Sequence, residues 1–167
     1  MQQLAHKDIV NKKNTLSIIL VCDVLNSPAN LGSLCRIAEA FGVAKLYINQ
    51  TNKDFLKSNR FKKTARHTDQ YLDLEFYTDF TQLFKTLKVE KYESVALEYC
   101  DKSVALPQIK FNEKTALVVG NEKSGVSETI LNFVEKSTHI DMYGRSSSIN
   151  VVQATAIALY ECVNQQR

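Results

Sequence analysis

The chain has 167 residues, of which 44% are hydrophobic and 23% are charged, and its formal net charge is +3. This length predicts one domain with a substantial core, and the composition is typical of a soluble globular protein. No apolar run approaches a membrane-spanning length and no signal-peptide pattern opens the chain. These features argue against membrane and exported classes and favour a cytoplasmic protein.

The cysteines do not form a recognisable site. They are scattered along the chain, without a C-x-x-C pair and without a histidine at ligand spacing: Cys22, Cys35, Cys100 and Cys162. Two fall in apolar strand contexts and two on expected helices. We therefore expect reduced, buried thiols in place of a disulfide or a metal site.

The first half of the chain alternates strand and helix. Residues 1–14 are polar and read as an N-terminal extension to a core expected over residues 15–163. Apolar, mostly branched residues run from Leu16 to Val24, a pattern typical of a strand covered on both faces. A helix is expected from near Asn30 to Gly42, followed by a strand at Lys45–Ile48. This order predicts a parallel sheet with a right-handed crossover.

The second half continues the alternation. Further strands are predicted at Tyr71–Tyr77, Ser94–Leu97, Thr115–Val119 and Ser137–Ile140, and further helices at Asp79–Val89, from a Ser127 cap to about Val134, and at Asn150–Val163. There is no internal repeat, no low-complexity tract and no linker rich in proline or glycine. The prediction is a single α/β domain over residues 1–167, a parallel sheet flanked by helices.

The last expected helix, Asn150–Val163, is apolar on every side and carries almost no charge. Such a helix is expected to be buried, either inside the domain or against a partner. A polar loop, Tyr143–Ser148, precedes it, so hydroxyls and free backbone N–H groups face the space before the helix. A buried helix with a polar entrance suggests a pocket.

Three loops follow predicted strands: Asn26–Gly32, Gly120–Gly125 and Tyr143–Asn150. In open α/β sheets, ligands bind at this carboxyl edge. The sequence has neither a G-x-G-x-x-G fingerprint nor a phosphate-binding loop, which argues against a dehydrogenase or a P-loop NTPase. No histidine is placed beside an obvious nucleophile, which argues against a hydrolase with a covalent intermediate.

A basic segment lies between Lys53 and His67. Its cations are Lys53, Lys57, Arg60, Lys62, Lys63 and Arg66, with Phe55 and Phe61 interleaved. Clustered cations with aromatic side chains are typical of a surface that binds a phosphate backbone and exposed bases. A solvated lysine-rich face is the alternative interpretation, and the sequence alone leaves both open.

Three motifs occur in a fixed order. The first is Asn30-Leu31-Gly32-Ser33-Leu34-Cys35-Arg36 with Phe41-Gly42, the second runs from Val118 to Val126, and the third is Ile140-Asp141-Met142 with Gly144 and Ser148-Ile149-Asn150-Val151. From Leu16 to Glu161 the chain resembles the SpoU-type (SPOUT class) RNA 2′-O-ribose methyltransferases. The resemblance implies a C-terminal deep trefoil knot (the alpha/beta knot), S-adenosylmethionine bound in it, and a homodimer in which the first motif approaches the partner's cofactor.

The resemblance also implies site residues. Cofactor contacts would come from Leu97, Gly120, Ile140, Met142 and Ile149, and catalysis would involve Arg36, Asn30, Glu122, Ser148 and Asn150. Ile140 and Ile149 could instead be ordinary core residues, and Gly120 could instead only end a strand in a turn. Arg36 has the alternative of a solvated surface position, and Ser148 and Asn150 that of local helix caps.

Methyl transfer to a ribose hydroxyl requires that this weak nucleophile gain alkoxide character. A guanidinium is too basic to remove the proton readily, so Arg36 is better suited to stabilise the developing oxyanion. Glu122 would orient Arg36 or Asn30. Lys123 stands where the family usually has glycine, Asp141 where proline is common and Ile149 where leucine is usual; the first two are expected to affect loop shape and cofactor affinity.

The predicted function is S-adenosylmethionine-dependent methylation of a ribose 2′-hydroxyl in structured RNA, with tRNA favoured over rRNA as the substrate. Neither a metal nor a membrane partner is expected. Because no separate RNA-binding domain is present, the basic segment would bind the RNA. A catalytically silent RNA-binding module with the same fold is the alternative. A methyltransferase for a protein or a small molecule is a third possibility, and it predicts weak RNA binding.

Overall fold

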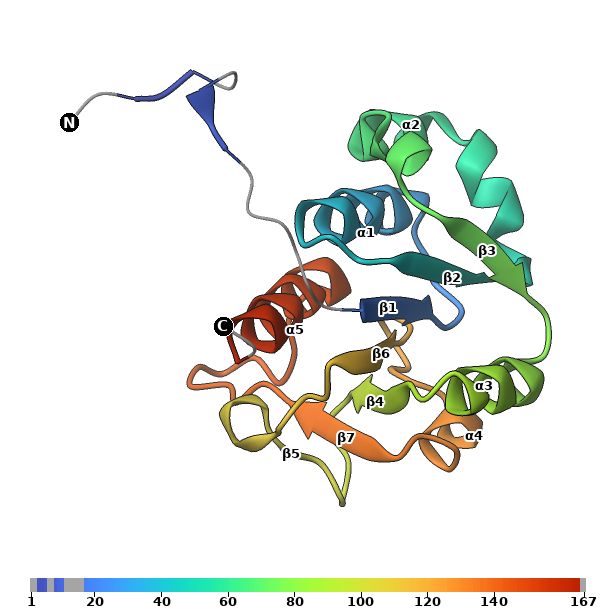
Figure 1. Cartoon of the computed structure of the whole chain (residues 1–167), viewed down its shortest axis with the longest axis vertical. Helices are drawn as coiled ribbons and strands as arrows, with labels where there is room; N and C mark the ends of the chain where they lie inside the picture. Colours follow the sequence, from blue (N-terminus) through green and yellow to red (C-terminus); the bar gives the residue numbers. More distant parts are fainter. Residues whose placement is uncertain (1–2, 6–7, 11–16, 166–167) are drawn as a thin grey trace.

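The computed structural model describes residues 3–5, 8–10 and 17–165 (Figure 1). Leu16 and most of the expected extension 1–14 lie outside these residues. The strands are β1 Ser17–Cys22, β2 Lys45–Asn49, β3 Leu74–Tyr77, β4 Glu93–Leu97, β5 Val104–Ala105, β6 Lys114–Val119 and β7 Lys136–His139; the α-helices are α1 Pro28–Ala40, α2 Asn59–Ala65, α3 Phe80–Val89, α4 Glu128–Leu131 and α5 Val151–Asn164.

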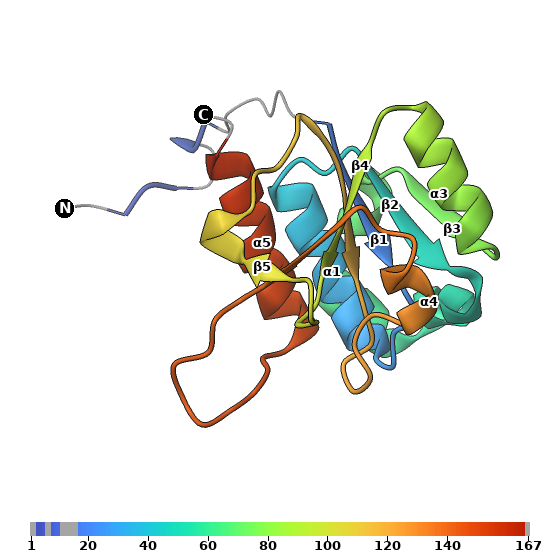
Figure 2. The ribbon, with the colours of Figure 1, turned by 90° about the horizontal axis from the view of Figure 1, so that it is seen from below.

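The strands form one seven-stranded sheet in the order β3-β2-β1-β6-β4-β7-β5, and every neighbouring pair is parallel. Figure 2 shows α1 and α5 on one face of this sheet and α3 and α4 on the other. The prediction of a parallel sheet flanked by helices is therefore confirmed. All parallel strands end at the same edge, so the loops after β1, β4, β6 and β7 lie close together.

The central strand β1 explains the continuous apolar run in the sequence. Ile18 and Leu20 belong to the hydrophobic core cluster that contains residues of α1 and α5. Ile19 and Val21 belong to the other cluster, which contains residues of α3 and α4. Since alternate side chains of a strand point to opposite faces, both faces of β1 must be apolar.

Helix α1 begins at Pro28, earlier than the expected start near Asn30. Ser27 is the N-cap, and its hydroxyl accepts a hydrogen bond from the Asn30 N–H at 3.4 Å. Proline is well suited to the first turn because it has no N–H to leave unpaired. The expected stop is confirmed, because Gly42 follows the helix with a φ of 66°.

Helix α2 packs closely on α1 at Gly32. A Cβ at this glycine would lie 2.6 Å from the Phe61 carbonyl oxygen and 2.8 Å from the Ala65 nitrogen. The missing side chain thus allows the two helix backbones to approach, which holds α2 and its basic residues against the first motif.

Several predicted boundaries were wrong. The expected strand Tyr71–Tyr77 is extended only over β3, because a 3-10 turn occupies Thr68–Tyr71. The helix after Ser127 ends at Leu131, since the chain must turn back into β7 within a few residues. Strand β7 ends at His139, one residue before the expected end, and β5 carried no recognisable sequence signal.

Within a single chain the last helix is buried on one side only, so burial inside the domain does not account for its whole surface, and burial against a partner stays a prediction. Thr155, Ala158 and Leu159 are buried, but Ile157 is 43% exposed and Tyr160 is 58% exposed. The sheet and α1 cover only one side of α5, so an apolar strip remains on its outer side in a single chain. Such a strip is where a partner surface would be expected.

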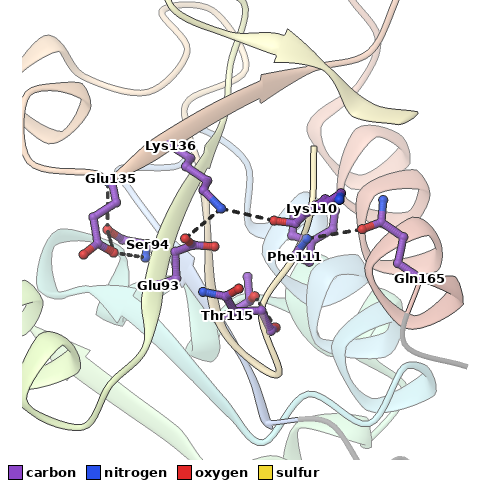
Figure 3. A network of polar contacts seen from close by, with 9 residues as sticks. Glu93, Ser94, Lys110, Phe111, Thr115, Glu135, Lys136 and Gln165 are labelled. Atoms are coloured by element: carbon purple, nitrogen blue, oxygen red, sulfur yellow. Dashed lines mark hydrogen bonds and ion pairs between the residues drawn. The ribbon is translucent and has the colours of Figure 1, made fainter. Parts of the chain in front are cut away.

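A polar network lies at the amino ends of β4 and β7, at the edge of the sheet opposite the loops that follow β1, β4, β6 and β7 (Figure 3). The Lys136 ammonium lies 2.7 Å from a Glu93 carboxylate oxygen and donates to the Lys110 carbonyl at 3.2 Å. The side-chain oxygen of Gln165, after α5, accepts from the Phe111 N–H at 3.2 Å. These contacts tie the strands and the last helix together away from the carboxyl edge.

The four cysteines are free thiols, as predicted. Three are buried, but Cys100 is only half-buried and lies in the loop after β4 instead of in a strand. Within residues 3–5, 8–10 and 17–165, no helix has both the length and the apolarity needed to cross a membrane.

Candidate active site

A cavity of about 310 Å³ opens at the carboxyl edge of the sheet. Its walls come from the ends of β4, β6 and β7, from the loop after β7 and from the first turns of α5. The lining residues include all five predicted cofactor contacts: Leu97, Gly120, Ile140, Met142 and Ile149. The location of the pocket follows directly from the parallel topology, and the sequence prediction of a pocket before the last helix is confirmed.

The turn that follows β6 forms one wall of this cavity. Asn121 and Gly125 exchange backbone hydrogen bonds of 2.8 and 2.9 Å, and Gly125 has a φ of 70°. A Cβ at Gly120 would lie 2.2 Å from the Gly125 carbonyl carbon and from the Val126 nitrogen. Gly120 is therefore required by the turn as well as placed on the cavity wall, so the two interpretations of this glycine are compatible.

The two substitutions that were expected to change the loops are accommodated. Lys123 is exposed, does not belong to the residues with positive φ, and donates its N–H to the Asn121 side chain at 2.8 Å. Glycine is thus not required at this position for backbone reasons. Asp141 lies after β7, with a carboxylate oxygen 3.5 Å from His139 Nε2.

A chain of polar side chains joins the three motifs. The Asn30 amide donates to a Glu122 carboxylate oxygen at 2.5 Å, and the Asn150 amide donates to the Asn30 side-chain oxygen at 3.3 Å. The second Glu122 oxygen accepts from the Asn26 N–H at 2.9 Å. Of the two partners considered for Glu122, Asn30 is therefore the one it contacts within a single chain.

The remaining predicted catalytic residues are placed differently. Ser148 lines the cavity and is not a helix cap. Asn150 is the cap of α5 and accepts from the Val152 N–H at 2.8 Å, while its amide group reaches Asn30. Arg36 is exposed on α1 and is not among the residues that line this cavity.

Sequence reasoning missed several residues at this edge. Asn26 donates to the Asn121 side chain at 2.7 Å, which adds a second contact between the loops after β1 and β6. Glu98, Tyr99 and His139 all line the cavity. Each of them lies at or just after the end of a strand, and this position at the carboxyl edge is the signal that could have identified them.

The buried thiol nearest this edge is chemically inert. Cys22 is the last residue of β1, and burial raises the pKa of its thiol far above the ordinary value. The thiol therefore stays protonated at neutral pH and is not a nucleophile. Burial likewise raises the pKa of the Tyr77 phenol, whose hydroxyl donates to the Cys22 carbonyl at 3.0 Å.

The six predicted RNA-binding cations are all exposed, from η2 (Gln50–Lys57) to the end of α2. Lys57 is paired with Asp54 at 2.8 Å. Of the two interleaved aromatic side chains, Phe61 is 2% exposed and therefore unavailable to stack on bases, which the stacking interpretation required. Phe55 is half-buried and packs against the core, where it stabilises η2.

Among the described residues, no group of three or more histidine, cysteine or acidic side chains is arranged to hold a metal ion. The polar side chains at the cavity are instead one amide, several hydroxyls, the carboxylates of Glu98 and Glu122, the Lys123 ammonium and the His139 imidazole.

Comparisons with known proteins agree with this architecture. A tRNA (guanosine(18)-2′-O)-methyltransferase from Aquifex aeolicus is 30% identical over 157 residues, which cover 94% of this chain and 74% of that protein. The crystal structure of the A. aeolicus TrmH/SpoU tRNA modifying enzyme superposes with a TM-score of 0.82 at 28% identity, covering 92% of this chain and 77% of the other.

A more distant structure shares the fold. The SpoU methyltransferase AviRb from Streptomyces viridochromogenes, solved in complex with the cofactor AdoMet, is 21% identical with a TM-score of 0.79, covering 99% of this chain and 63% of the other. The chain spans only 10% and 11% of the length of two further relatives, from Mus musculus and Saccharomyces cerevisiae, both named as tRNA (guanosine(18)-2′-O)-methyltransferases. The model of the SpoU rRNA Methylase family matches residues 17–160, and the chain belongs to this family.

Proposed function

We propose that this protein is an S-adenosylmethionine-dependent methyltransferase that acts on a ribose 2′-hydroxyl of tRNA. The observation that carries the proposal is the hydrogen-bonded chain Glu122–Asn30–Asn150, which joins all three motifs beside the cavity. The names of the relatives favour tRNA as the substrate, because the Aquifex, mouse and yeast proteins are all named for it. Relatives named for rRNA make rRNA the second choice.

The cavity suits the proposed cofactor. Its volume of about 310 Å³ falls at the lower end of the range for small-molecule sites. Leu97, Ile140, Met142 and Ile149 offer an apolar wall for an adenine ring, and main-chain groups beside Gly120 offer donors and acceptors. When bound, the cofactor supplies an electrophilic methyl group on a sulfonium sulfur.

The side chains around the cavity would position the ribose and stabilise charge. Hydrogen bonds to Glu122 and Asn150 hold the Asn30 amide from both sides. The amide is therefore already oriented and need not reorient during the reaction. Ser148 offers a hydroxyl at the cavity wall. Arg36 would stabilise the oxyanion that develops as the hydroxyl attacks and would contact a neighbouring phosphate.

A homodimer is part of this proposal. Arg36 does not line the cavity of its own chain, so a second copy would have to bring its own Arg36 to this site. The exposed Ile157 and Tyr160 of α5 offer an apolar surface for such an association. The deep trefoil knot formed by the loop after β7, and a cytoplasmic location, are also proposed on the family resemblance.

The basic side chains of η2 and α2 would bind the phosphate backbone of the RNA. Neutralising Lys62 and Lys63 together by substitution with glutamine should weaken tRNA binding and reduce the slope of log affinity against log salt by about 2, the scale expected for two phosphate contacts. Substitution of the exposed Lys85 and Lys88 of α3, on the opposite face of the sheet, is the matched control. An unchanged slope in the Lys62/Lys63 variant would place RNA binding elsewhere.

The function is tested by two measurements. Isothermal titration calorimetry with S-adenosylmethionine at high micromolar concentration should give a binding isotherm. Incubation of total RNA from a strain lacking the protein, with labelled cofactor, should transfer label to a 2′-O-methylated nucleoside that is then mapped. RNA binding without cofactor binding would support the catalytically silent module, and methylation of protein or small molecules without RNA binding would reject the RNA substrate.

A further inference from the structure

Glu98 lies at a branch point between the cofactor cavity and the second motif. It is the first residue after β4, and its own backbone N–H donates to the Thr138 carbonyl at 2.8 Å, which extends the pairing with β7. Its carbonyl accepts from the Ser137 hydroxyl at 3.2 Å. The backbone of Glu98 is thus held firmly, and the residue lines the cavity.

The Glu98 carboxylate is also held by hydrogen bonds. One oxygen accepts from the Val126 N–H at 2.8 Å and the other accepts from the Tyr99 N–H at 3.0 Å. The group packs directly on the turn after β6, because a Cβ at Gly125 would lie 2.2 Å from a Glu98 oxygen. These contacts determine where the carboxylate lies before any ligand arrives.

The carboxylate retains unused acceptor capacity. An ionised carboxylate has about four lone-pair positions, two on each oxygen, and each Glu98 oxygen uses one of them for a backbone N–H. One position therefore remains on each oxygen. A vicinal diol matches this arrangement, since its two hydroxyls donate to two neighbouring oxygens. In dinucleotide-binding α/β sheets, an acidic side chain likewise hydrogen-bonds a ribose hydroxyl of the bound cofactor.

We propose that Glu98 is a ligand-binding residue that accepts hydrogen bonds from the ribose hydroxyls of the bound adenosyl cofactor. The inference rests on the proposed function, because it requires an adenosyl ligand in this cavity. It also links the ligand to catalysis: Glu98 accepts from the Val126 N–H, and the turn between Asn121 and Gly125 just before it carries Glu122, which accepts from Asn30.

The test compares Glu98→Gln with Asp23→Asn. Asp23 is a matched control, because its carboxylate accepts from the Ser127 N–H at 3.1 Å, one residue beyond Val126, yet Asp23 does not line the cavity. Both substitutions remove a carboxylate that holds the same segment. Calorimetry with S-adenosylhomocysteine should show a loss of affinity of about tenfold or more for Glu98→Gln only, the scale of hydrogen bonds to a charged acceptor.

A second ligand separates direct contact from a structural effect. The unsubstituted protein should bind S-adenosylhomocysteine more tightly than its 2′,3′-dideoxy analogue, and Glu98→Gln should largely abolish this preference. An equal loss of affinity in the Glu98 and Asp23 variants, or a dideoxy preference that persists in Glu98→Gln, would overturn the inference. If Glu98→Gln does not fold, equal affinity of the unsubstituted protein for the two ligands still overturns it. Failure of the unsubstituted protein to bind S-adenosylhomocysteine and S-adenosylmethionine would instead reject the proposed function.

Discussion

Replacing Gly32 with alanine tests whether the contact between α1 and α2 is as close as the structure indicates. In an ordinary helix interior, this change stabilises by about 1 kcal/mol, because alanine has the higher helix propensity. Here the new Cβ would lie 2.2 Å from the Thr64 hydroxyl, 2.6 Å from the Phe61 carbonyl oxygen and 2.8 Å from the Ala65 nitrogen. The threonine side chain can rotate away, but the two backbone atoms move only if α2 moves.

The magnitude follows from these two opposing effects. Overpacking a close contact costs about 1–3 kcal/mol, and the backbone contacts place Gly32→Ala toward the upper end of that range. After the gain in helix propensity, a net destabilisation of about 1–2 kcal/mol remains. For a chain of this size, that corresponds to a fall in Tm of about 2–8 °C.

Urea unfolding followed by circular dichroism measures the free energy of unfolding of both proteins. Ser33→Ala, at the neighbouring half-buried position of the same helix, is the control and should change stability by less than about 0.5 kcal/mol. A Gly32→Ala protein as stable as the parent, or more stable, would refute the close approach of the two helices and the role assigned to this glycine.

Three further predictions concern the site and the core. Arg36→Ala should lower turnover about a hundredfold or more, equivalent to about 3 kcal/mol of lost oxyanion stabilisation, with unchanged cofactor affinity by calorimetry; unchanged turnover would refute its role. A double-mutant cycle of Asn30→Ala and Glu122→Ala can be measured by urea unfolding. This partly exposed pair should show a coupling energy of about 1 kcal/mol. Additive effects of the two substitutions would contradict the contact. Burial raises the pKa of Cys35 to about 12, so its thiolate is scarce until the pH approaches that value. At pH 8, a thiol reagent should therefore modify half-buried Cys100 first. It should modify all four thiols only after the protein is denatured.

The general architecture was predictable because its signals are local. A strand buried on both faces must be apolar throughout, and a helix packed on a sheet must repeat its apolar residues every three or four positions. Leu16–Val24 showed the strand pattern and the segment from Asn30 to Gly42 showed the helix pattern, so the parallel sheet and this helix were predicted; the nearly uncharged apolar segment Asn150–Val163 predicted the last helix. Weaker local signals gave the wrong ends for β3 and α4 and no indication of β5.

The predicted site residues also show what the sequence could predict and what it could not. The family resemblance implied that Gly120, Met142 and Ile149 contact one cofactor, and the structure places all three on one cavity at the common edge of the parallel strands. Sequence order could not show that Glu122 contacts Asn30 within one chain, since these residues are 92 positions apart and meet only through the pairing of β1 with β6.

The sequence by itself determined the class of the sheet, the edge where ligands bind and the helix that borders the pocket, since each of these depends on residues close together in the chain. Only the tertiary structure decided that the Phe61 side chain of α2 is buried and that one side of α5 remains uncovered. It also decided that the Glu98 carboxylate accepts a hydrogen bond from Val126, after the turn that follows β6. The physical reason is that side-chain burial and hydrogen bonding between distant segments depend on how the elements pack, and no local pattern encodes that packing.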